Sequence, residues 1–237
     1  MGIKERKVST SRLAISRQSP VQLAKQVIVN PRGRNRFLSQ LPEQPCVLDV
    51  GCGNDSPRVF KALRPDMHYV GLDVGDCRQP VDPRSYADEY VIVDPVDFRD
   101  AIVRLGRRFD GIVSSHNLEH CDDPYGVVCA MAGALKPGGQ LYLAFPCAAS
   151  KGFPSRDGCL NFFDDPTHKD VPDFGKVCDL LGELGLRIDF SRERYRPPVK
   201  FALGAGIEPI SALRGRVMVG TWALYGFEAV IWARLPG

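Results

Sequence analysis

One segment constrains the fold more than any other, an apolar run that ends in a glycine turn and leads into a helix start. Its sequence is Val47-Leu48-Asp49-Val50-Gly51-Cys52-Gly53-Asn54-Asp55. Gly51 and Gly53 allow a sharp turn and a close approach of the backbone to a ligand. Twenty residues after Gly53, Asp73 ends the next apolar run, where a carboxylate can accept hydrogen bonds from two ribose hydroxyls. The turn and the acid together predict a nucleoside site.

Short apolar runs alternate with helix-like segments from Cys46 onward. Pro124 begins one such helix, and Lys136-Pro137-Gly138-Gly139 is typical of a helix stop followed by a turn. Alternating strands and helices predict a doubly wound α/β fold, a parallel sheet with helices on both faces that binds ligands at the carboxyl ends of its strands. The predicted strands are Cys46–Val50, His68–Asp73, Tyr90–Asp94, Asp110–Ser114, Gln140–Phe145, Leu186–Phe190 and Phe227–Leu235.

Charge divides the chain into a basic arm and an acidic body. Residues 1–36 contain nine Lys or Arg and one Glu, whereas the rest contains 22 basic and 27 acidic residues. We interpret residues 1–44 as an arm with a short helix that begins at Ser19, and residues 45–237 as one domain. Such an arm could contact nucleic acid or an anionic membrane, and a solvated tail is the simpler interpretation.

Hydropathy and cysteine usage indicate the compartment. The longest stretch without Asp, Glu, Lys or Arg has 14 residues, Pro137–Ser150. That is shorter than the roughly 18 apolar residues typical of a membrane span. Eight scattered cysteines without a C-x-x-C pair favour reduced thiols in a cytoplasmic compartment. No secretory signal is indicated, whereas the arm, rich in Ser and Arg, leaves an organellar transit peptide open.

The charge of Asp49 discriminates between nucleoside ligands. A dinucleotide site needs a third glycine where this chain has Ser56, and it avoids negative charge beside the pyrophosphate. Asp49 lies two residues before Gly51, so its carboxylate would repel a pyrophosphate and attract a sulfonium and an amino group. The sequence therefore favours S-adenosylmethionine over NAD.

These residues resemble the class I S-adenosylmethionine-dependent methyltransferases. The turn from Asp49 to Gly53 resembles the first motif of that family, and Asp73 resembles its ribose-binding acid. Phe109–His120 resembles the motif at the fourth strand, and Leu135–Pro146 resembles the turn into the fifth strand. One departure is Asp55, where the family usually has glycine, which puts the geometry of the turn in doubt.

The resemblance implies a Rossmann-like sheet of seven strands, mostly parallel, with the last strand antiparallel. Asp94 matches a position that often contacts adenine, with Pro95 beside the ring. The cofactor-binding residues that follow from the resemblance are Asp49, Gly51, Cys52, Gly53, Asp73, Val74, Asp94, Pro95, Ser115 and His116.

Four side chains near the predicted acceptor side can serve catalysis. Methyl transfer to a hydroxyl needs positioning and removal of a proton. His116, Glu119 and His120 have the spacing i, i+3, i+4, which places them on one face if the segment is helical, and His168 follows in a later loop.

Three interpretations of these side chains stay open. His116 or His168 is a catalytic base, as we assign them. Alternatively, His116, Glu119, His120 and His168 hold a divalent cation, since a similar cluster occurs in ubiquinone-pathway O-methyltransferases and small-RNA methyltransferases. In the third interpretation, Leu118-Glu119-His120 only packs the loop. We assign no metal, and Glu119 and His120 are the candidate ligands if one is needed.

Two segments are expected on the substrate side, the loop 147–172 and the apolar insert 197–225. The insert is flanked by basic residues, so it is either packed on the sheet edge or a peripheral membrane contact. We expect O-methylation of a small-molecule, glycan or lipid-linked acceptor. The acidic body, and the absence of an Asn-Pro-Pro-Tyr motif after the fourth strand, argue against nucleic acid. The alternatives are an RNA or protein methyltransferase that uses the arm, and a catalytically silent nucleoside-binding module.

Overall fold

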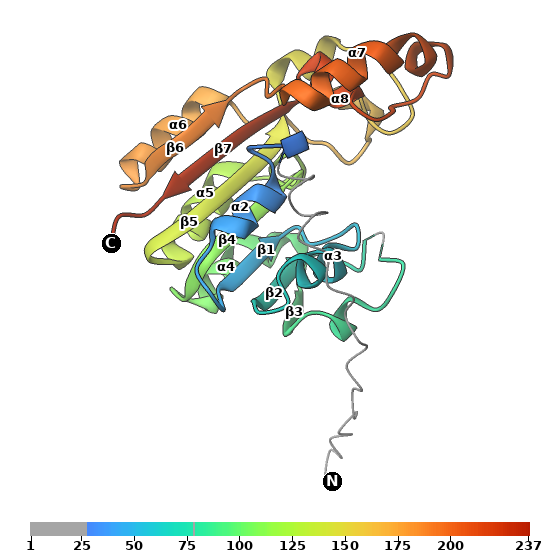
Figure 1. Cartoon of the computed structure of the whole chain (residues 1–237). Helices are drawn as coiled ribbons and strands as arrows, with labels where there is room; N and C mark the ends of the chain where they lie inside the picture. Colours follow the sequence, from blue (N-terminus) through green and yellow to red (C-terminus); the bar gives the residue numbers. More distant parts are fainter. Residues whose placement is uncertain (1–27, 78) are drawn as a thin grey trace.

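The computed structural model describes residues 28–77 and 79–237, so the predicted helix from Ser19 and most of the basic arm lie outside the described residues. The described chain contains one mixed sheet with the strand order β3-β2-β1-β4-β5-β7-β6 (Figure 1). Only β7 runs antiparallel to its neighbours, β5 and β6, which confirms the predicted architecture. The strands are β1 (Cys46–Val50), β2 (His68–Asp73), β3 (Glu89–Ile92), β4 (Phe109–Ser115), β5 (Leu135–Pro146), β6 (Arg187–Arg192) and β7 (Glu228–Arg234).

Helices cover both faces of the sheet. The helices α2 and α3 pack on one face, and α4, α5 and α6 pack on the other. Two further helices, α7 and α8, project beyond the carboxyl ends of β4 and β5 (Figure 1). The helices are α2 (Arg34–Gln40), α3 (Ser56–Leu63), α4 (Phe98–Leu105), α5 (Pro124–Ala134), α6 (Phe174–Glu183), α7 (Pro198–Leu213) and α8 (Thr221–Tyr225).

The central strand β1 shows why its sequence is apolar almost throughout. Successive side chains of a strand point to opposite faces of a sheet. Val47 packs in the core beneath α2 and α3, while Leu48 and Val50 pack in the core beneath α4 and α5. All three side chains are fully buried, as expected for a strand that is covered by helices on both faces.

The bounds of β3 to β7 differ from the predicted ones, by one or two residues except at the start of β5, and two of these differences have a clear local cause. β3 ends at Ile92 rather than at Asp94, because the Asp94 carboxylate accepts a hydrogen bond from the Val96 N–H and caps a short 3-10 helix. β5 begins at Leu135 rather than at Gln140. Phe109 pairs with Leu135 and Gly111 pairs with Gln140, so the residues between them, predicted as a turn, bulge from the strand ladder.

The predicted apolar insert, residues 197–225, forms α7 and α8, which pack against one another. The described part of the chain has no helix with both the length and the apolar character needed to cross a bilayer.

Candidate active site

The glycine turn between β1 and α3 is as tight as its sequence predicts. Gly51 has a φ of +80°, and a Cβ at this position would lie 2.6 Å from the Asn117 Cβ beyond the end of β4. A Cβ on Gly53 would lie 3.0 Å from the Cys77 carbonyl oxygen and 3.6 Å from an Asp73 carboxylate oxygen. Both glycines are therefore needed for the close approach of β1, β2 and β4 at their carboxyl ends.

Asp55, the departure from the family pattern, leaves the turn intact. Its φ of 63° lies in the left-handed region, which Asp tolerates better than most residues. The Asp55 N–H donates a hydrogen bond to the Gln79 Oε1 at 3.1 Å, and the Gln79 Nε2 donates one to the Cys52 carbonyl oxygen at 2.9 Å. Gln79 therefore stabilises the turn through a hydrogen bond on either side of it. The alternative of a catalytically silent module rested on a disrupted turn at Asp55, so it loses its support.

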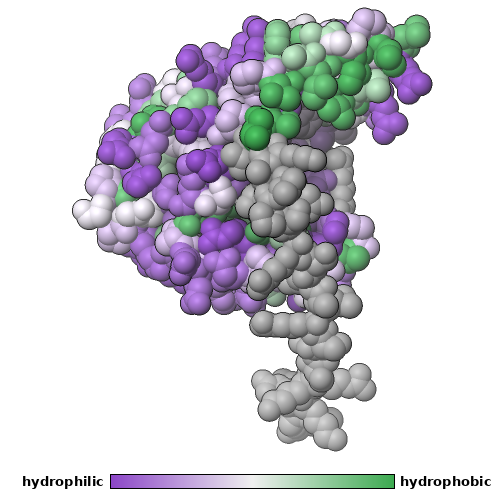
Figure 2. All heavy atoms as spheres, in the orientation of Figure 1, coloured by the Kyte–Doolittle hydropathy of each residue, from purple (hydrophilic) through white to green (hydrophobic). Residues whose placement is uncertain are grey.

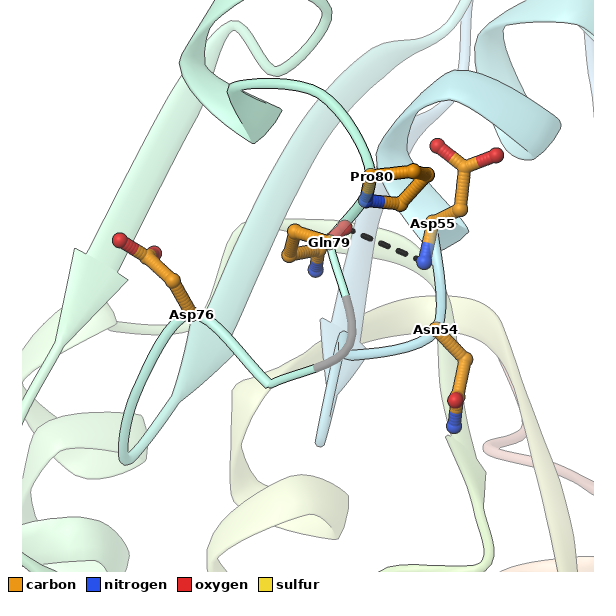
Figure 3. A pocket seen from close by; sticks show the side chains of 5 residues that line it. All are labelled: Asn54, Asp55, Asp76, Gln79 and Pro80. Carbon is orange, nitrogen blue, oxygen red and sulfur yellow. Dashed lines mark hydrogen bonds between the residues drawn. The ribbon is translucent and has the colours of Figure 1, made fainter.

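Sequence reasoning missed Gln79, because its contacts join a loop after β2 to a turn that precedes it by more than twenty residues. An open hollow of about 590 Å³ lies beside this turn. Figure 3 shows the Gln79 side chain between the turn and the loop, with the Asp76 and Asp55 carboxylates at opposite sides. The hollow is lined by Asn54, Asp55, Asp76, Gln79 and Pro80.

Asp73 is held ready at the end of β2. Its carboxylate accepts a hydrogen bond from the Val74 N–H at 2.7 Å. Burial raises the pKa of Asp73, and the N–H groups of Val74, Gly53 and Gly75 oppose that rise. Main-chain donors therefore fix the carboxylate beside the glycine turn, where the sequence predicts ribose binding. Asp94 and Pro95 lie exposed beyond the adjacent strand β3, and their predicted contact with adenine stays a prediction.

Asp49 lies inside the sheet rather than in the crevice. Only 1% of its surface is exposed, and its carboxylate accepts a hydrogen bond from the Tyr69 hydroxyl at 2.7 Å. Burial raises the pKa of Asp49 to about 6, against the charge of Arg34 and the hydroxyls of Tyr69 and Ser56. The carboxylate is therefore mostly ionised at neutral pH. Its influence on a ligand above the turn is that of a buried negative charge, not of a direct contact.

His116 follows Ser115, the last residue of β4, and is gripped by two carboxylates. Its Nδ1 lies 3.1 Å from a Glu119 oxygen, and its Nε2 lies 3.0 Å from an oxygen of Glu228 on β7. Burial lowers the pKa of His116, but the hydrogen bonds and charges of the two carboxylates outweigh it and raise the pKa to about 10. The ring is therefore an imidazolium that donates both N–H groups.

This geometry argues against the assignment of His116 as a catalytic base, since an imidazolium has no lone pair to accept a proton. A shared face of His116, Glu119 and His120 was predicted only if the segment is helical, and it is not helical at His116. His116 has a φ of 54°, which interrupts any helix, and only Leu118–His120 forms a 3-10 turn. His116 therefore points to β7 and acts as a structural cation between β4 and β7.

Glu119, which also contacts His116, forms a cluster with His120 and His168, in which one ligand atom of each residue lies within 4.8 Å of the others. Glu119 is fully buried, and its Oε2 has no hydrogen-bond partner. The loop after residue 160 brings in His168, and the Lys169 N–H donates to the Glu119 carbonyl oxygen at 2.8 Å. The sequence analysis named all three members of this cluster, and it also included His116, which lies outside the cluster.

Hydrogen bonds fix the tautomers of both histidines. The His168 Nδ1 lies 2.6 Å from the Phe162 carbonyl oxygen, which can only accept, so Nδ1 carries the proton. The Thr167 hydroxyl donates to Asp165 at 2.6 Å, so it accepts from the His120 Nδ1 at 3.0 Å. In the neutral form of each ring the lone pair is therefore on Nε2. Two such imidazoles and the Glu119 carboxylate form a set that suits either proton removal or a divalent cation.

The two segments expected on the substrate side pack on one another. The Arg156 guanidinium, in the loop 147–172, pairs with Glu208 of α7 at 2.6 Å. The indole N–H of Trp222 in α8 donates to the Cys159 carbonyl oxygen at 2.9 Å, and its ring centroid lies 5.0 Å from that of His116. The loop and the insert therefore form one wall next to the carboxyl end of β4.

The site geometry is compatible with a methyltransferase, and comparison with known protein families assigns the chain to one. A family model described as a methyltransferase domain matches residues 23–189, more than half of the chain. The chain belongs to this methyltransferase family. The predictions of a class I S-adenosylmethionine-dependent methyltransferase and of its methyl donor are thereby confirmed.

Solved structures confirm the fold. A SAM-dependent methyltransferase from Archaeoglobus fulgidus superposes with a TM-score of 0.53 at 18% identity, over 89% of this chain and 93% of that chain. An S-adenosylmethionine-dependent methyltransferase from Mesorhizobium loti gives 0.56 at 17% identity, over 84% and 96%. At these identities the likeness concerns the fold alone.

Curated relatives match this chain at 28–29% identity. The ubiquinone biosynthesis O-methyltransferase of Marinobacter nauticus is 29% identical over 178 residues, which cover 68% of this chain and 72% of the relative. The 27-O-demethylrifamycin SV methyltransferase of Amycolatopsis mediterranei is 28% identical over 101 residues, or 41% and 37%. An uncharacterised Methanocaldococcus jannaschii protein is matched over only 27% of its length. Two of these three matches therefore cover less than half of the relative's length.

Removal of the buried charge of Asp49 should weaken ligand binding but should not lower the stability of the fold. In Asp49→Asn, the side chain still accepts from Tyr69 but attracts no cation, so we expect about tenfold weaker S-adenosylmethionine binding by calorimetry. Because burial raises the pKa of this carboxyl, folding stability is lost as the pH rises from the unfolded-state pKa of 3.8 to the folded-state pKa of about 6, and the full cost applies above it. That cost is about 3 kcal/mol, so thermal unfolding at neutral pH should occur at an equal or higher temperature in the variant.

The control for this prediction is Asp82→Asn, which removes a carboxylate from the exposed surface. It should leave both binding and unfolding unchanged. Unchanged affinity in Asp49→Asn would contradict the electrostatic role of Asp49.

Proposed function

We propose that the protein transfers a methyl group from S-adenosylmethionine to an oxygen of a small-molecule or glycan acceptor. The observation that carries this proposal is the cluster of Glu119, His120 and His168 beyond the end of β4, in which both imidazoles are oriented through Nδ1 and the buried carboxylate has an unpartnered oxygen. A hydroxyl must lose its proton to become a strong nucleophile, and this set of atoms suits that task.

The residues around the glycine turn fit the methyl donor. Gly51 and Gly53 allow the tight turn that brings its backbone beside Asp73, and the oriented Asp73 carboxylate suits a ribose. When bound, S-adenosylmethionine supplies a methyl group on a positively charged sulfur. The chain holds the donor, positions the acceptor oxygen and removes its proton, and positioning contributes most because the leaving group is already good.

His168 is the best placed base for this reaction. Its Nδ1–H is held by the Phe162 carbonyl oxygen, and its ring stacks on that of Phe162 with centroids 4.6 Å apart. These two contacts fix the direction of the free Nε2. A proton taken from the acceptor hydroxyl would reside on Nε2, and the Phe162 carbonyl would stabilise the resulting imidazolium.

A divalent cation on the same cluster is the second way to ionise the acceptor, favoured by the buried and unpartnered Glu119 Oε2. Two imidazoles and one carboxylate suit a borderline metal such as Zn²⁺, Mn²⁺ or Fe²⁺. Such an ion would lower the pKa of a bound hydroxyl. Both versions suit a hydroxyl acceptor, and two of the relatives above carry names that place their action on oxygen.

The experiment that tests this function has two steps. Calorimetry measures binding of S-adenosylmethionine, with NAD as the control ligand. Isotope-labelled S-adenosylmethionine is then incubated with panels of phenols, sugar alcohols, nucleic acids and amines, and mass spectrometry locates the methyl group. We expect methylated oxygen in phenols or sugars. Labelling confined to RNA, protein or amines, or binding of NAD alone, would contradict the proposal.

A further inference from the structure

The outer surface of α7 is unusual for a helix on the surface of a protein. Apolar residues follow one another at helical spacing along its exposed side, and Leu203, Ile210 and Leu213 are 45%, 48% and 89% exposed. The only charged residues within the helix are Lys200 and Glu208. A helix without a polar face is normally buried in a core or in a bilayer. Figure 2 shows a patch of hydrophobic residues in the region of α7.

The inner side of α7 is firmly attached, so the patch is presented by a fixed element. Gly204 lies against Gly220, where a Cβ would come within 2.2 Å of a carbonyl oxygen. The Glu208 carboxylate pairs with Arg156 and accepts a hydrogen bond from the Tyr225 hydroxyl at 2.7 Å. These contacts neutralise the acid of the helix and leave its outward side apolar.

Basic residues flank α7 in the sequence on both sides. Residues 192–216 contain six Arg or Lys and two Glu, and one of the two acids is Glu208, which Arg156 already neutralises. The other is Glu193, and Asp157 lies 3.6 Å from Arg216 at the rim. The margin of the patch therefore keeps a net positive charge. The six basic residues are Arg192, Arg194, Arg196, Lys200, Arg214 and Arg216.

We propose that the exposed face of α7 docks on an anionic lipid surface. An apolar helix face bordered by Lys and Arg is what an interface between acyl chains and acidic head groups attracts. The helix has 16 residues and is about 24 Å long, shorter than the hydrocarbon core of a bilayer, so it lies in the interface and does not cross it.

A second copy of the chain is a poorer occupant of this face. In a symmetric dimer the same patch meets itself, so a positive margin would face a positive margin. Anionic head groups instead neutralise that margin. The proposal goes beyond the methyl-transfer function and does not depend on the identity of the acceptor.

Docking would place the catalytic side of the sheet next to the lipid. Trp222 of α8 stacks on Phe227 with ring centroids 4.8 Å apart, and both rings lie against His116 at the end of β4. The helix that faces outward and the wall of the candidate active site therefore belong to one packed unit. An acceptor with an apolar tail would enter from the membrane side.

Vesicle flotation of the full chain tests the proposal. The vesicles contain phosphatidylcholine alone, or phosphatidylcholine with roughly a third of phosphatidylglycerol to supply negative charge. We expect the protein to float with the anionic vesicles and not with the neutral ones, and high salt should reduce the floating fraction.

Matched variants locate the contact on α7. Leu213→Glu and Ile210→Glu place acids on the exposed patch, and we expect at least tenfold less flotation for the pair because apolar burial and charge attraction are both lost. Val103→Glu, on exposed α4, introduces the same acid elsewhere and should float like the wild type. Calorimetry with S-adenosylmethionine shows that each variant is folded, and its result is independent of lipid.

Three results would overturn the proposal. The first is no flotation of the wild type with anionic vesicles, and the second is equal flotation of the α7 variants. The third is a dimer in sedimentation velocity that Leu213→Glu dissociates, since α7 would then be covered by a second copy. Failure of S-adenosylmethionine binding in the wild type would instead count against the proposed function and leave the flotation result standing.

Discussion

His168→Ala is expected to lower the turnover number for methyl transfer at least a hundredfold, the effect typical of a lost catalytic base. The affinity for S-adenosylmethionine should not change, because His168 lies in the loop after residue 160 and not at the glycine turn. Turnover is measured with the acceptor that the screen identifies, and affinity by calorimetry. The expected separation of turnover from affinity distinguishes a residue that acts on the acceptor from one that holds the donor.

His68→Ala is the matched control for His168→Ala. His68 begins β2 and pairs with Glu89 on the surface, far along the strand from its carboxyl end. Its removal should leave turnover and affinity within about twofold of the wild type, since a surface ion pair contributes little. A His168→Ala enzyme with wild-type turnover would remove His168 from both versions of the mechanism.

A chelator separates the two versions. If a cation acts on the cluster, EDTA should abolish turnover, Mn²⁺ or Zn²⁺ should restore it, and Glu119→Gln should weaken calorimetric metal binding. If His168 is the base, chelated enzyme keeps full turnover and no metal binding is detected. The metal titration gives an answer even where no acceptor has been found.

The sequence alone predicted the elements whose formation depends on residues close together in the chain. β1 and β2 were predicted with their bounds, because each is an apolar run that ends at a turn or an acid. The glycine turn was predicted even though Asp55 replaces a glycine, since Asp adopts the same left-handed backbone. The end of β3 was missed because a side-chain cap at Asp94 competed with the strand.

Contacts between distant segments could not be predicted from such patterns. Glu228 lies 112 residues after His116, yet it converts that histidine from a predicted base into a structural imidazolium. Gln79 closes the glycine turn from a loop whose sequence carries no motif. The spacing of His116, Glu119 and His120 suggested one helical face, but the left-handed backbone of His116 leaves its ring beside Glu119 and Glu228 and outside the cluster with His120 and His168. Side-chain partners across the sheet decide chemical roles that residue type alone leaves open.

Asp73→Ala is expected to weaken S-adenosylmethionine binding by about a hundredfold or more. Two hydrogen bonds from ribose hydroxyls to a carboxylate would be lost, each worth about 1.5–3 kcal/mol. The fold should tolerate the change. The Asp73 carboxylate accepts hydrogen bonds from the N–H groups of Val74 and Gly53 at the edge of the crevice, where water can replace the carboxylate. Asp100→Ala, an exposed acid on α4, is the control and should bind normally.

S-adenosylhomocysteine gives the sharper measurement, because it keeps the ribose and lacks the positive sulfur. A ribose contact is equal in the two compounds, so Asp73→Ala should weaken both by the same factor. The buried charge of Asp49 acts on the sulfonium, so Asp49→Asn should weaken S-adenosylmethionine more than S-adenosylhomocysteine. The ratio of the two affinities therefore assigns each acid to one part of the ligand. If Asp73→Ala changed that ratio and Asp49→Asn did not, the two roles would have to be exchanged.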